Sequence, residues 1–366
     1  MSDVIVVGAG IIGLAHAWAA ARRGKKVLVI DRDDQANGAS VRNFGFITVS
    51  GQERGRVWDL ARRTAGMWRE VAREAAIPVA QEGLLLIARR PEALAVIDSF
   101  MTTEMGAGCT RLTQAQLADI CPTPDALGAM HSSVDLRVES RTAIPRLAAW
   151  LEQAYGVEFR YGVTVRSVES GRVETTAGEF RADCILVCPG DNWSTLYPET
   201  GAEAGITRCK LQMLRLAPPP AWLPAPVMSD LSMVRYTGYA HLPEANALLK
   251  RLRSEEPAAL DHGIHLIVVQ SEDGSLVVGD SHVYAPTPDP FALETVDAEI
   301  LRQYAAVLGT PPAVIERWTG IYASAAGHSI VRAPADGVRL IIVTSGTGAS
   351  TGFALAEDVV ADLFDS

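Results

Sequence analysis

Residues 3–31 constrain the fold of this chain more than any other stretch. They open with a continuous apolar run from Val4 to Val7, which is the pattern of a strand buried on both faces. Gly8, Gly10 and Gly13 follow with the spacing G-x-G-x-x-G. In that spacing the first glycine allows a tight turn, the second lets the backbone approach a pyrophosphate, and the third lets a helix pack closely on the strand.

A helix and a second strand complete this unit. We expect the helix from Ile11 to Arg23, where proline is absent and alanine is frequent, and Gly24 ends it. Val27 to Ile30 is a second buried strand that leads to Asp31, 21 residues after Gly10. A carboxylate about 20 residues after the glycines accepts hydrogen bonds from an adenosine ribose. The order of these elements predicts a Rossmann-type site for FAD or NAD, not NADP.

Composition excludes several other classes of protein. The chain has 366 residues, 48% of them hydrophobic, which is enough for a large core and two domains. The formal net charge of −10 argues against a nucleic-acid partner, which needs a basic face. No apolar run reaches the ~18 residues of a membrane span. Because the first strand begins at residue 3, we expect no targeting segment and a cytoplasmic location.

The cysteine and histidine patterns predict neither disulfides nor a metal. The five cysteines form no C-x-x-C pair, so we expect them to be reduced thiols that fill the core. No histidine and cysteine spacing is typical of a zinc site, and we therefore expect no metal.

A second glycine-rich turn lies near the end of the chain. Val338 to Thr344 is an expected strand, residues 345–352 read Ser-Gly-Thr-Gly-Ala-Ser-Thr-Gly, and a helix is expected from Phe353 to Phe364. A glycine turn before a helix aims free backbone N–H groups at a ligand. Farther upstream, the apolar run Ala182–Cys188 ends at Pro189 and Gly190. The sequence therefore predicts that both ends of the chain contribute to one nucleotide site.

The region from Lys210 to Tyr322 has a different character. It is rich in proline and holds apolar pieces that we expect to be strands of an antiparallel sheet. These pieces are Met233–Leu242, Ile264–Val269, Leu276–Gly279 and Val314–Tyr322. In a straight strand Arg235, Tyr239 and His241 would share one face. That face lines a pocket in one interpretation and meets solvent in the other.

With both ends of the chain in place, the sequence resembles the D-amino-acid-oxidase-like family of FAD-dependent oxidoreductases over essentially all of its length. The resemblance implies an α/β fold with a Rossmann-like, GR2-type FAD-binding domain, formed by residues 1–80, 140–208 and 325–366. It also implies an α+β substrate domain on a large mixed or antiparallel sheet, formed by residues 81–139 and 209–324.

The resemblance further implies a set of residues that contact FAD. They are Gly8, Ala9, Gly10, Ile11, Ile12, Gly13, Asp31, Arg32, Ser40, Arg42, Asn43, Phe44, Gly45, Val165, Pro189, Gly190, Trp193, Gly346, Gly348, Ala349, Ser350 and Thr351.

Several longer strings resemble the members of this family that are associated with phosphonate catabolism. The strings are Ser40-Val-Arg-Asn-Phe-Gly-Phe-Ile with Gly51-Gln52, Lys210-Leu-Gln-Met-Leu, and Gly279-Asp-Ser-His-Val-Tyr284 with Asp289-Pro-Phe. This resemblance implies oxidation of 2-aminoethylphosphonate or its N-methyl derivative to phosphonoacetaldehyde. Hydride would pass from the C–H beside the amine to flavin N5, and O2 would reoxidise the flavin to give H2O2.

Two departures from the family pattern bear on substrate and cofactor. Where glycine-oxidase-like members carry an arginine that grips the substrate carboxylate, this chain reads Trp318-Thr-Gly-Ile-Tyr322. A tyrosine there removes a bidentate carboxylate partner and puts an ordinary amino acid in doubt. Where sarcosine-oxidase-like members carry a cysteine that bonds the flavin, Gly320 stands here, so we expect noncovalent FAD.

The substrate-side predictions are the least constrained. We expect Tyr322 and His282 to be catalytic, and Arg235, Tyr236, Tyr239, His241 and Tyr322 to bind a small anionic amine. The alternative is an oxidase or dehydrogenase of glycine, sarcosine or a D-amino acid. The electron acceptor is O2 or another acceptor such as a quinone or a partner protein, and the oligomeric state stays open. A noncatalytic nucleotide-binding module is a further alternative that the two glycine turns disfavour.

Overall fold

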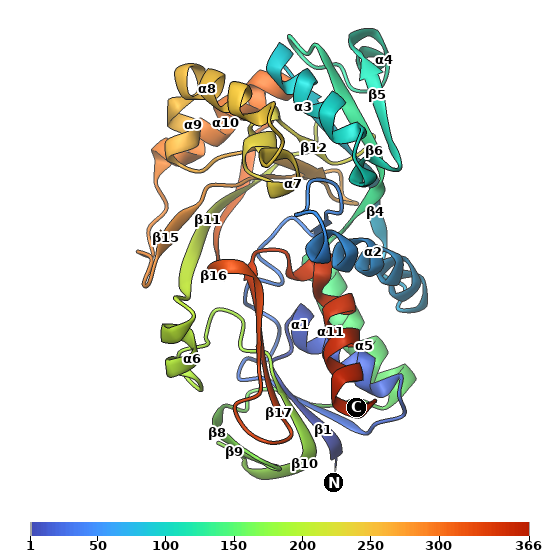
Figure 1. The fold of residues 1–366 in the computed structure, drawn as a ribbon, viewed down its shortest axis with the longest axis vertical. Coiled ribbons are helices and arrows are strands. Elements are labelled where there is room, and N and C mark those ends of the chain that lie inside the picture. Colours follow the sequence, from blue (N-terminus) through green and yellow to red (C-terminus); the bar gives the residue numbers. More distant parts are fainter. Residues whose placement is uncertain (1, 366) are drawn as a thin grey trace.

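The computed structural model describes residues 2–365 and has two parts at opposite ends of its long axis (Figure 1). The part that holds both termini is built on five parallel strands in the order β7-β2-β1-β10-β17. These strands are β1 (Ser2–Val7), β2 (Val27–Ile30), β7 (Glu158–Arg160), β10 (Gly178–Val187) and β17 (Val338–Ser345).

Both faces of this parallel sheet are buried, which explains the continuous apolar runs. In β1, Val4 and Val6 face a helical layer, whereas Ile5 and Val7 join the cluster on the opposite face. The helical layer contains α1 (Ile11–Ala21), α2 (Arg56–Glu74), α5 (Ser140–Tyr155) and α11 (Gly348–Phe364). The opposite face is partly covered by a small antiparallel sheet in which β8 (Val165–Glu169) and β9 (Arg172–Thr175) extend β10.

Aromatic rings hold the first and last helices of this layer together. The Phe353 ring lies 5.1 Å from the Trp18 ring and 5.0 Å from the Trp68 ring, with both pairs edge to face. The Trp68 indole also donates a hydrogen bond of 2.7 Å to the backbone oxygen of Ala349. Packing of this kind explains how an element at the end of the chain docks beside the first helix.

The other part is built on a mixed sheet. Its strands are β3 (Phe46–Ile47), β4 (Val79–Ala88), β5 (Cys109–Thr113), β6 (Gly128–Val138), β11 (Thr207–Leu216), β12 (Val227–Met228), β13 (Ile267–Gln270), β14 (Leu276–Gly279), β15 (Val283–Ala285) and β16 (Val314–Arg332). Strand β6 pairs with β3, β4 and β5, and β4 runs parallel to β12. The remaining order β12-β13-β14-β11-β16 is antiparallel, with β15 beside β11 as well.

Short helices cover this mixed sheet and contribute to its core. They are α3 (Pro91–Met101), η1 (Glu104–Gly106), α4 (Gln114–Ile120), η2 (Asp230–Val234), α7 (Thr237–Ala240), α8 (Ala245–Glu255), α9 (Pro257–Asp261) and α10 (Glu294–Leu308), while α6 (Pro198–Glu203) follows β10. The α/β fold class is thereby confirmed, whereas the residue boundaries of the two domains stay a prediction.

Strand β16 belongs to both sheets. Its first half pairs with β11 from Val314 to Ser324, and its second half pairs with β17 from Ser329 to Arg332. The expected strand Val314–Tyr322 is therefore only the first part of a strand of 19 residues. One continuous strand thus joins the two parts of the molecule.

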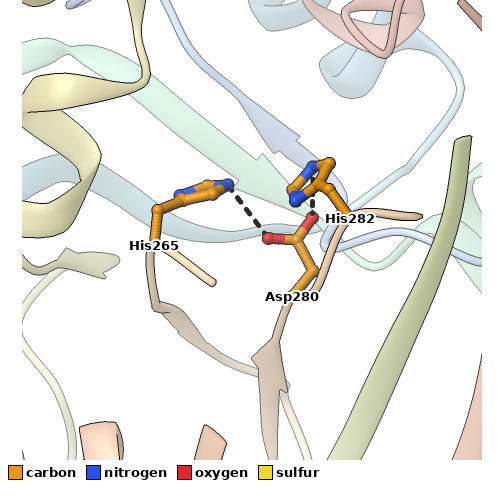
Figure 2. Close-up of side chains that lie close together, drawn as sticks. All are labelled: His265, Asp280 and His282. Carbon is orange, nitrogen blue, oxygen red and sulfur yellow. Dashed lines mark ion pairs between the residues drawn. The ribbon is translucent and has the colours of Figure 1, made fainter. Parts of the chain in front are cut away.

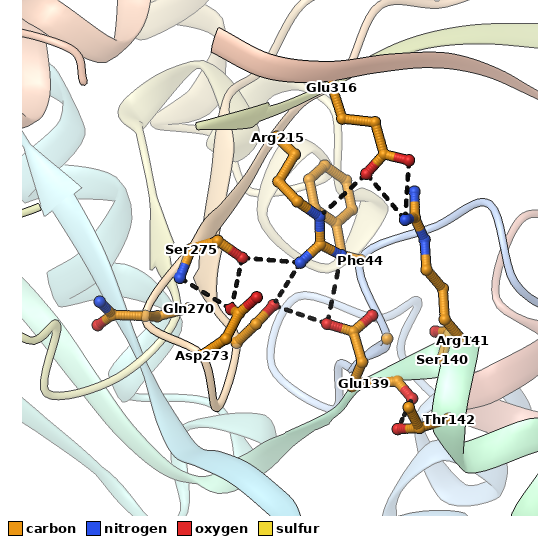
Figure 3. Close-up of polar contacts among 12 residues, drawn as sticks. Phe44, Glu139, Ser140, Arg141, Thr142, Arg215, Gln270, Asp273, Ser275 and Glu316 are labelled. Atoms are coloured by element: carbon orange, nitrogen blue, oxygen red, sulfur yellow. Dashed lines mark hydrogen bonds and ion pairs between the residues drawn. The ribbon is translucent and has the colours of Figure 1, made fainter. Parts of the chain in front are cut away.

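A buried ion cluster lies at Glu139, directly after β6, and Figure 3 shows its contact with Arg215. Arg137 is fully buried and donates to Glu139 at 2.9 Å and to the backbone oxygens of Phe44 and Gln270 at 3.1 Å each. Arg215 lies 3.4 Å from the same Glu139 carboxylate. Because a buried charge is costly unless it is paired and hydrogen-bonded, the cluster fixes the relative positions of the segments that carry it.

The strand predicted at Met233–Leu242 is wrong. This segment forms η2 and α7, and Arg235 lies between them. The Ser229 side chain caps the first turn by accepting from the Leu231 N–H. Met233, Tyr236 and Tyr239 recur every three residues, a helical repeat that a strand interpretation misses.

Two helix bounds also differ from those predicted. The last helix begins at Gly348, so the glycine turn supplies its first turn, and the first helix, expected to end at Arg23, ends at Ala21. Among the described residues no helix is long and apolar enough to span a bilayer.

All five cysteines are free, and four of them are buried, as the thiol prediction requires. The cytoplasmic location stays a prediction.

We predict that Phe353→Ala strongly destabilises the protein. The substitution removes a buried ring and leaves a cavity between α1, α2 and α11, which costs about 3–5 kcal/mol in the free energy of unfolding. Chemical denaturation of the flavin-loaded protein measures the loss. Phe291→Ala, at a side chain that is 70% exposed, is the matched control and should shift the midpoint little. Equal shifts for the two variants would contradict this assignment.

Candidate active site

The turn between β1 and α1 has the geometry that its glycines predict. Gly8 adopts a φ of +106°, and a Cβ there would lie 2.4 Å from the Cys188 oxygen. A Cβ on Gly13 would lie 1.8 Å from the Gly8 oxygen. Both positions therefore exclude a side chain, and the helix packs on the strand as closely as a dinucleotide turn requires.

Asp31 organises this turn from the end of β2. Its carboxylate accepts the Ala9 N–H at 2.6 Å through Oδ2 and the Asp33 N–H at 2.9 Å through Oδ1. The acid thus lies directly beside the glycine turn, where the sequence predicts a ribose partner. Contact with the ribose itself stays a prediction.

A cavity of about 530 Å³ begins at this turn and extends to the mixed sheet. Many of the residues expected to contact FAD line it: Gly10, Ile11, Ile12, Gly13, Ser40, Arg42, Asn43, Phe44, Gly190, Gly346, Gly348, Ala349 and Ser350. Other expected residues lie outside the lining: Gly8, Ala9, Asp31, Arg32, Gly45, Val165, Pro189, Trp193 and Thr351.

Two of the outlying residues have clear structural roles. Val165 is buried in the apolar cluster that contains Ile5 and Val7. The Trp193 ring packs on Gly201, where a Cβ would approach it to 2.1 Å, and the Arg208 guanidinium lies over it at 5.4 Å. Neither residue lines the cavity, and contact of either with FAD stays a prediction.

The segment after β2 forms one wall of the cavity. The Ser40 hydroxyl accepts the Ile11 N–H at 2.9 Å, at the first residue of α1. Asn43 holds the loop, because its amide donates to the Ala39 oxygen and its carbonyl accepts from the Gly45 N–H, both at 2.6 Å. The polar side chains predicted to face the cofactor therefore also shape the loop that lines its site.

The C-terminal turn forms the facing wall. Gly346 has a φ of +72°, and a Cβ there would lie 3.1 Å from the Tyr322 ring. The Ser350 hydroxyl accepts the Thr48 N–H at 2.9 Å. The two glycine-rich turns thus border one cavity, as the sequence predicts.

At the far end of the cavity, strand register brings three polar side chains together. Cys209 in β11 lies opposite Tyr284 in β15 and Tyr322 in β16. The Arg235 guanidinium donates to the Tyr284 hydroxyl at 2.7 Å. Burial lowers the pKa of Arg235, but the oxygens of Tyr284 and Tyr322 outweigh burial and raise the pKa above its usual value, so this side chain remains a cation.

Tyr322 remains a neutral phenol at this end of the cavity. Burial, together with the neighbouring Cys209 and Tyr284, raises its pKa well above the usual value. A neutral phenol beside a guanidinium can donate a hydrogen bond to an anion. Tyr284 was not singled out from the sequence, because only strand register shows that it flanks Cys209 with Tyr322.

The remaining substrate-side predictions divide into two groups. Tyr236 lines the cavity beside Arg235. Tyr239 is fully buried, with its ring 4.6 Å from Phe100, and His241 is exposed; neither lines the cavity. The shared face expected for Arg235, Tyr239 and His241 is wrong, because the segment is helical.

Three buried polar side chains converge on one another, as Figure 2 shows, and they line the same cavity as Arg235. His265 Nε2 lies 3.0 Å from Asp280 Oδ1, and His282 Nε2 lies 3.5 Å from Asp280 Oδ2. Burial lowers the pKa of His282 to about 3, so its imidazole is neutral. Burial raises the pKa of Asp280, but the two histidines and Arg235 outweigh it and leave the pKa below its usual value. His282 is a residue that the sequence singles out. Asp280 lies in the same string, Gly279-Asp-Ser-His, but was not predicted as a site residue, and His265 carries no local signal and was missed.

We predict that Gly13→Ala releases the cofactor. The new methyl group would clash with the Gly8 oxygen and open the turn, and every 1.4 kcal/mol lost weakens cofactor binding by about tenfold. Flavin absorbance of the purified protein and titration with FAD measure the loss. Gly66→Ala in α2 is the control, because its Cβ would meet no atom within 4 Å. Equal flavin content in both variants would refute the prediction.

Comparison with known proteins agrees with this geometry. Residues 3–363 match the family described as DAO, FAD dependent oxidoreductase. A subunit of opine oxidase from Agrobacterium tumefaciens (strain Ach5) is 26% identical over 236 residues, 58% of this chain and 62% of that protein. D-amino acid dehydrogenase of Helicobacter pylori (strain ATCC 700392 / 26695) is 46% identical over 47 residues, 13% of this chain and 12% of that protein. Both alignments thus span less than two thirds of the relative.

A solved structure supports the same fold. Glycine oxidase from Geobacillus kaustophilus superposes with a TM-score of 0.78 at 18% identity, over 100% of this chain and 94% of that one. The glycine turns without room for a side chain, the acid beside them and the cavity between the two turns all fit a bound dinucleotide. The chain therefore belongs to the DAO family of FAD-dependent oxidoreductases, and FAD is its cofactor.

Proposed function

We propose that this protein oxidises a small amine or amino acid that carries an anionic group. The observation that carries this proposal is the Arg235 guanidinium in the cavity, hydrogen-bonded to Tyr284 at 2.7 Å and close to the neutral phenol of Tyr322. A cation with two phenols is a suitable partner for a carboxylate or a phosphonate. The cavity then extends from the anion site to the nucleotide turn.

The bound flavin supplies the chemistry by accepting a hydride from the C–H bond next to the amine. The protein contributes position and charge. Arg235 fixes the anionic end of the substrate, while Tyr322 donates to it and packs against Gly346 in the cofactor-side turn. The imine product then reacts with water to give an aldehyde or an oxo acid and an amine.

The substrate class is the finer question. Tyr322 stands where glycine-oxidase-like members are expected to hold the substrate carboxylate with an arginine. Arg235 lies beside that tyrosine but comes from a different segment, so it replaces the missing cation. The names of the relatives, an opine oxidase subunit, a D-amino acid dehydrogenase and a glycine oxidase, favour an amino-acid substrate. 2-Aminoethylphosphonate and its N-methyl derivative are the second candidates, from the resemblance of the longer strings.

We also propose that FAD is held noncovalently and that O2 is the electron acceptor. Among the described residues that line the cavity, the one thiol is Cys188, and it lies at the nucleotide turn against Gly8. Gly320 lines the cavity where a flavin-bonding cysteine would stand. Acid precipitation, which releases noncovalent flavin into the supernatant, tests the first point, and H2O2 formation under air tests the second.

Anaerobic flavin reduction distinguishes the substrate classes. The purified protein is mixed with glycine, sarcosine, D-alanine, an N-carboxyalkyl amino acid, 2-aminoethylphosphonate and its N-methyl derivative, and the oxidised-flavin band is followed. We expect an anionic amine to bleach the band and ethylamine, which lacks the anion, to leave it. Bleaching by phosphonates alone would favour the second candidate. If ethylamine bleached the flavin band as much as the anionic amines do, the proposal of an anion site would be wrong.

We predict that Arg235→Met raises the KM for the anionic substrate by about 10- to 100-fold, because a hydrogen bond to a charged group is worth about 1.5–3 kcal/mol. Steady-state kinetics measure the change, and flavin content checks that the cofactor site is intact. Arg166→Met is the matched control at an exposed arginine. An unchanged KM in Arg235→Met would place the anion elsewhere in the cavity.

A further inference from the structure

We propose that His265, Asp280 and His282 form a binding site for a divalent transition-metal ion, open to the substrate end of the cavity. The three residues lie in connecting segments next to β13, β14 and β15. Each offers one ligand atom, and these atoms all lie within 4.8 Å of one another. All three side chains are at least nine-tenths buried, with residue exposures of 3%, 6% and 9%.

The Nδ1 atom of His282 is a hydrogen-bond donor, which leaves its Nε2 lone pair free for a metal. His282 Nδ1 lies 2.8 Å from the Gly263 backbone oxygen, which can only accept, so Nδ1 carries the proton. Ser232 donates its hydroxyl to the His265 backbone oxygen at 2.9 Å, and its oxygen also lies 3.2 Å from His265 Nδ1. In the tautomer in which His265 Nδ1 donates to Ser232, both histidines present Nε2 lone pairs, as metal-ligating histidines do.

The converging atoms lack a positive charge between them. Nε2 of His265 and Nε2 of His282 lie 3.0 and 3.5 Å from the two oxygens of the buried Asp280 carboxylate. A divalent cation among these atoms would neutralise the buried carboxylate, whose charge is otherwise costly. A metal with ligand distances of about 2.0–2.2 Å holds neighbouring ligand atoms about 2.9–3.5 Å apart, which matches these separations.

The ligand types select the class of ion. Two imidazoles and one carboxylate suit zinc, cobalt, nickel or iron, whereas magnesium and calcium prefer oxygen ligands. Three protein ligands leave coordination positions vacant, and all three residues line the cavity.

The positive charge of Arg235 repels a metal ion at this site. It acts electrostatically on Asp280 and His282, and it donates its hydrogen bond to Tyr284. An anionic ligand in the cavity would balance the charges of both Arg235 and the ion. This last point rests on the proposed function, whereas metal binding itself does not.

The site is tested by metal titration of the flavin-loaded protein after treatment with a chelator and dialysis. We expect calorimetry to show one equivalent of Zn²⁺, and Co²⁺ to give visible ligand-field bands from an N,O site. Mg²⁺ should not bind. Absence of Zn²⁺ and Co²⁺ binding overturns the proposal.

Variants locate the bound ion. His282→Gln and Asp280→Asn should each weaken Zn²⁺ binding by at least tenfold and abolish the Co²⁺ bands, while flavin content and thermal midpoint report folding. His241→Gln, at an exposed histidine, should retain both properties. Unchanged binding in His282→Gln would show that the ion lies elsewhere. If the metal result holds but no anionic amine bleaches the flavin, the proposed function fails and the metal site stands.

Discussion

The double pairing of β16 is the constraint on which the rest of the structure depends. One strand continues the mixed sheet through β11 and the parallel sheet through β17, so the two sheets meet at a fixed distance and angle. Tyr322 and Gly320 lie on this strand and line the cavity. A Cβ added to Gly320 would lie only 2.9 Å from the Arg42 backbone oxygen, so the strand passes close to that loop. The position of the site follows from the hydrogen bonds of a single backbone segment.

The two ends of the cavity use different physical means. At the nucleotide end, backbone groups and missing side chains create the space, since Gly8 and Gly13 have no room for a Cβ. At the other end, charged and polar side chains, Arg235, Asp280 and the two histidines, create the chemistry. The first arrangement suits a large cofactor with many contacts, and the second suits the selection of a small ligand by its charge.

These two arrangements explain how much the sequence could predict. Backbone geometry is encoded locally, so the spacing of Gly8, Gly10 and Gly13 was enough to predict the fold class and the nucleotide turn. The substrate end depends on which strands are neighbours, and no local pattern predicts that Cys209 would bring Tyr284 and Tyr322 to one place. The strand prediction for residues 233–242 was wrong for a related reason. In a short segment the apolar residues can fit both the two-residue repeat of a strand and the three-residue repeat of a helix, and only the packing partners decide between them.

The ion cluster around Arg137 and Glu139 has a consequence for unfolding. It ties β6, β11 and the turn between β13 and β14 to the segment that carries Phe44, which lines the cavity. Separating any one of these segments from the others would leave a fully buried guanidinium without some of its partners. The mixed sheet therefore cannot unfold locally at this point at low cost, and the cavity wall that carries Phe44 depends on the core of that sheet.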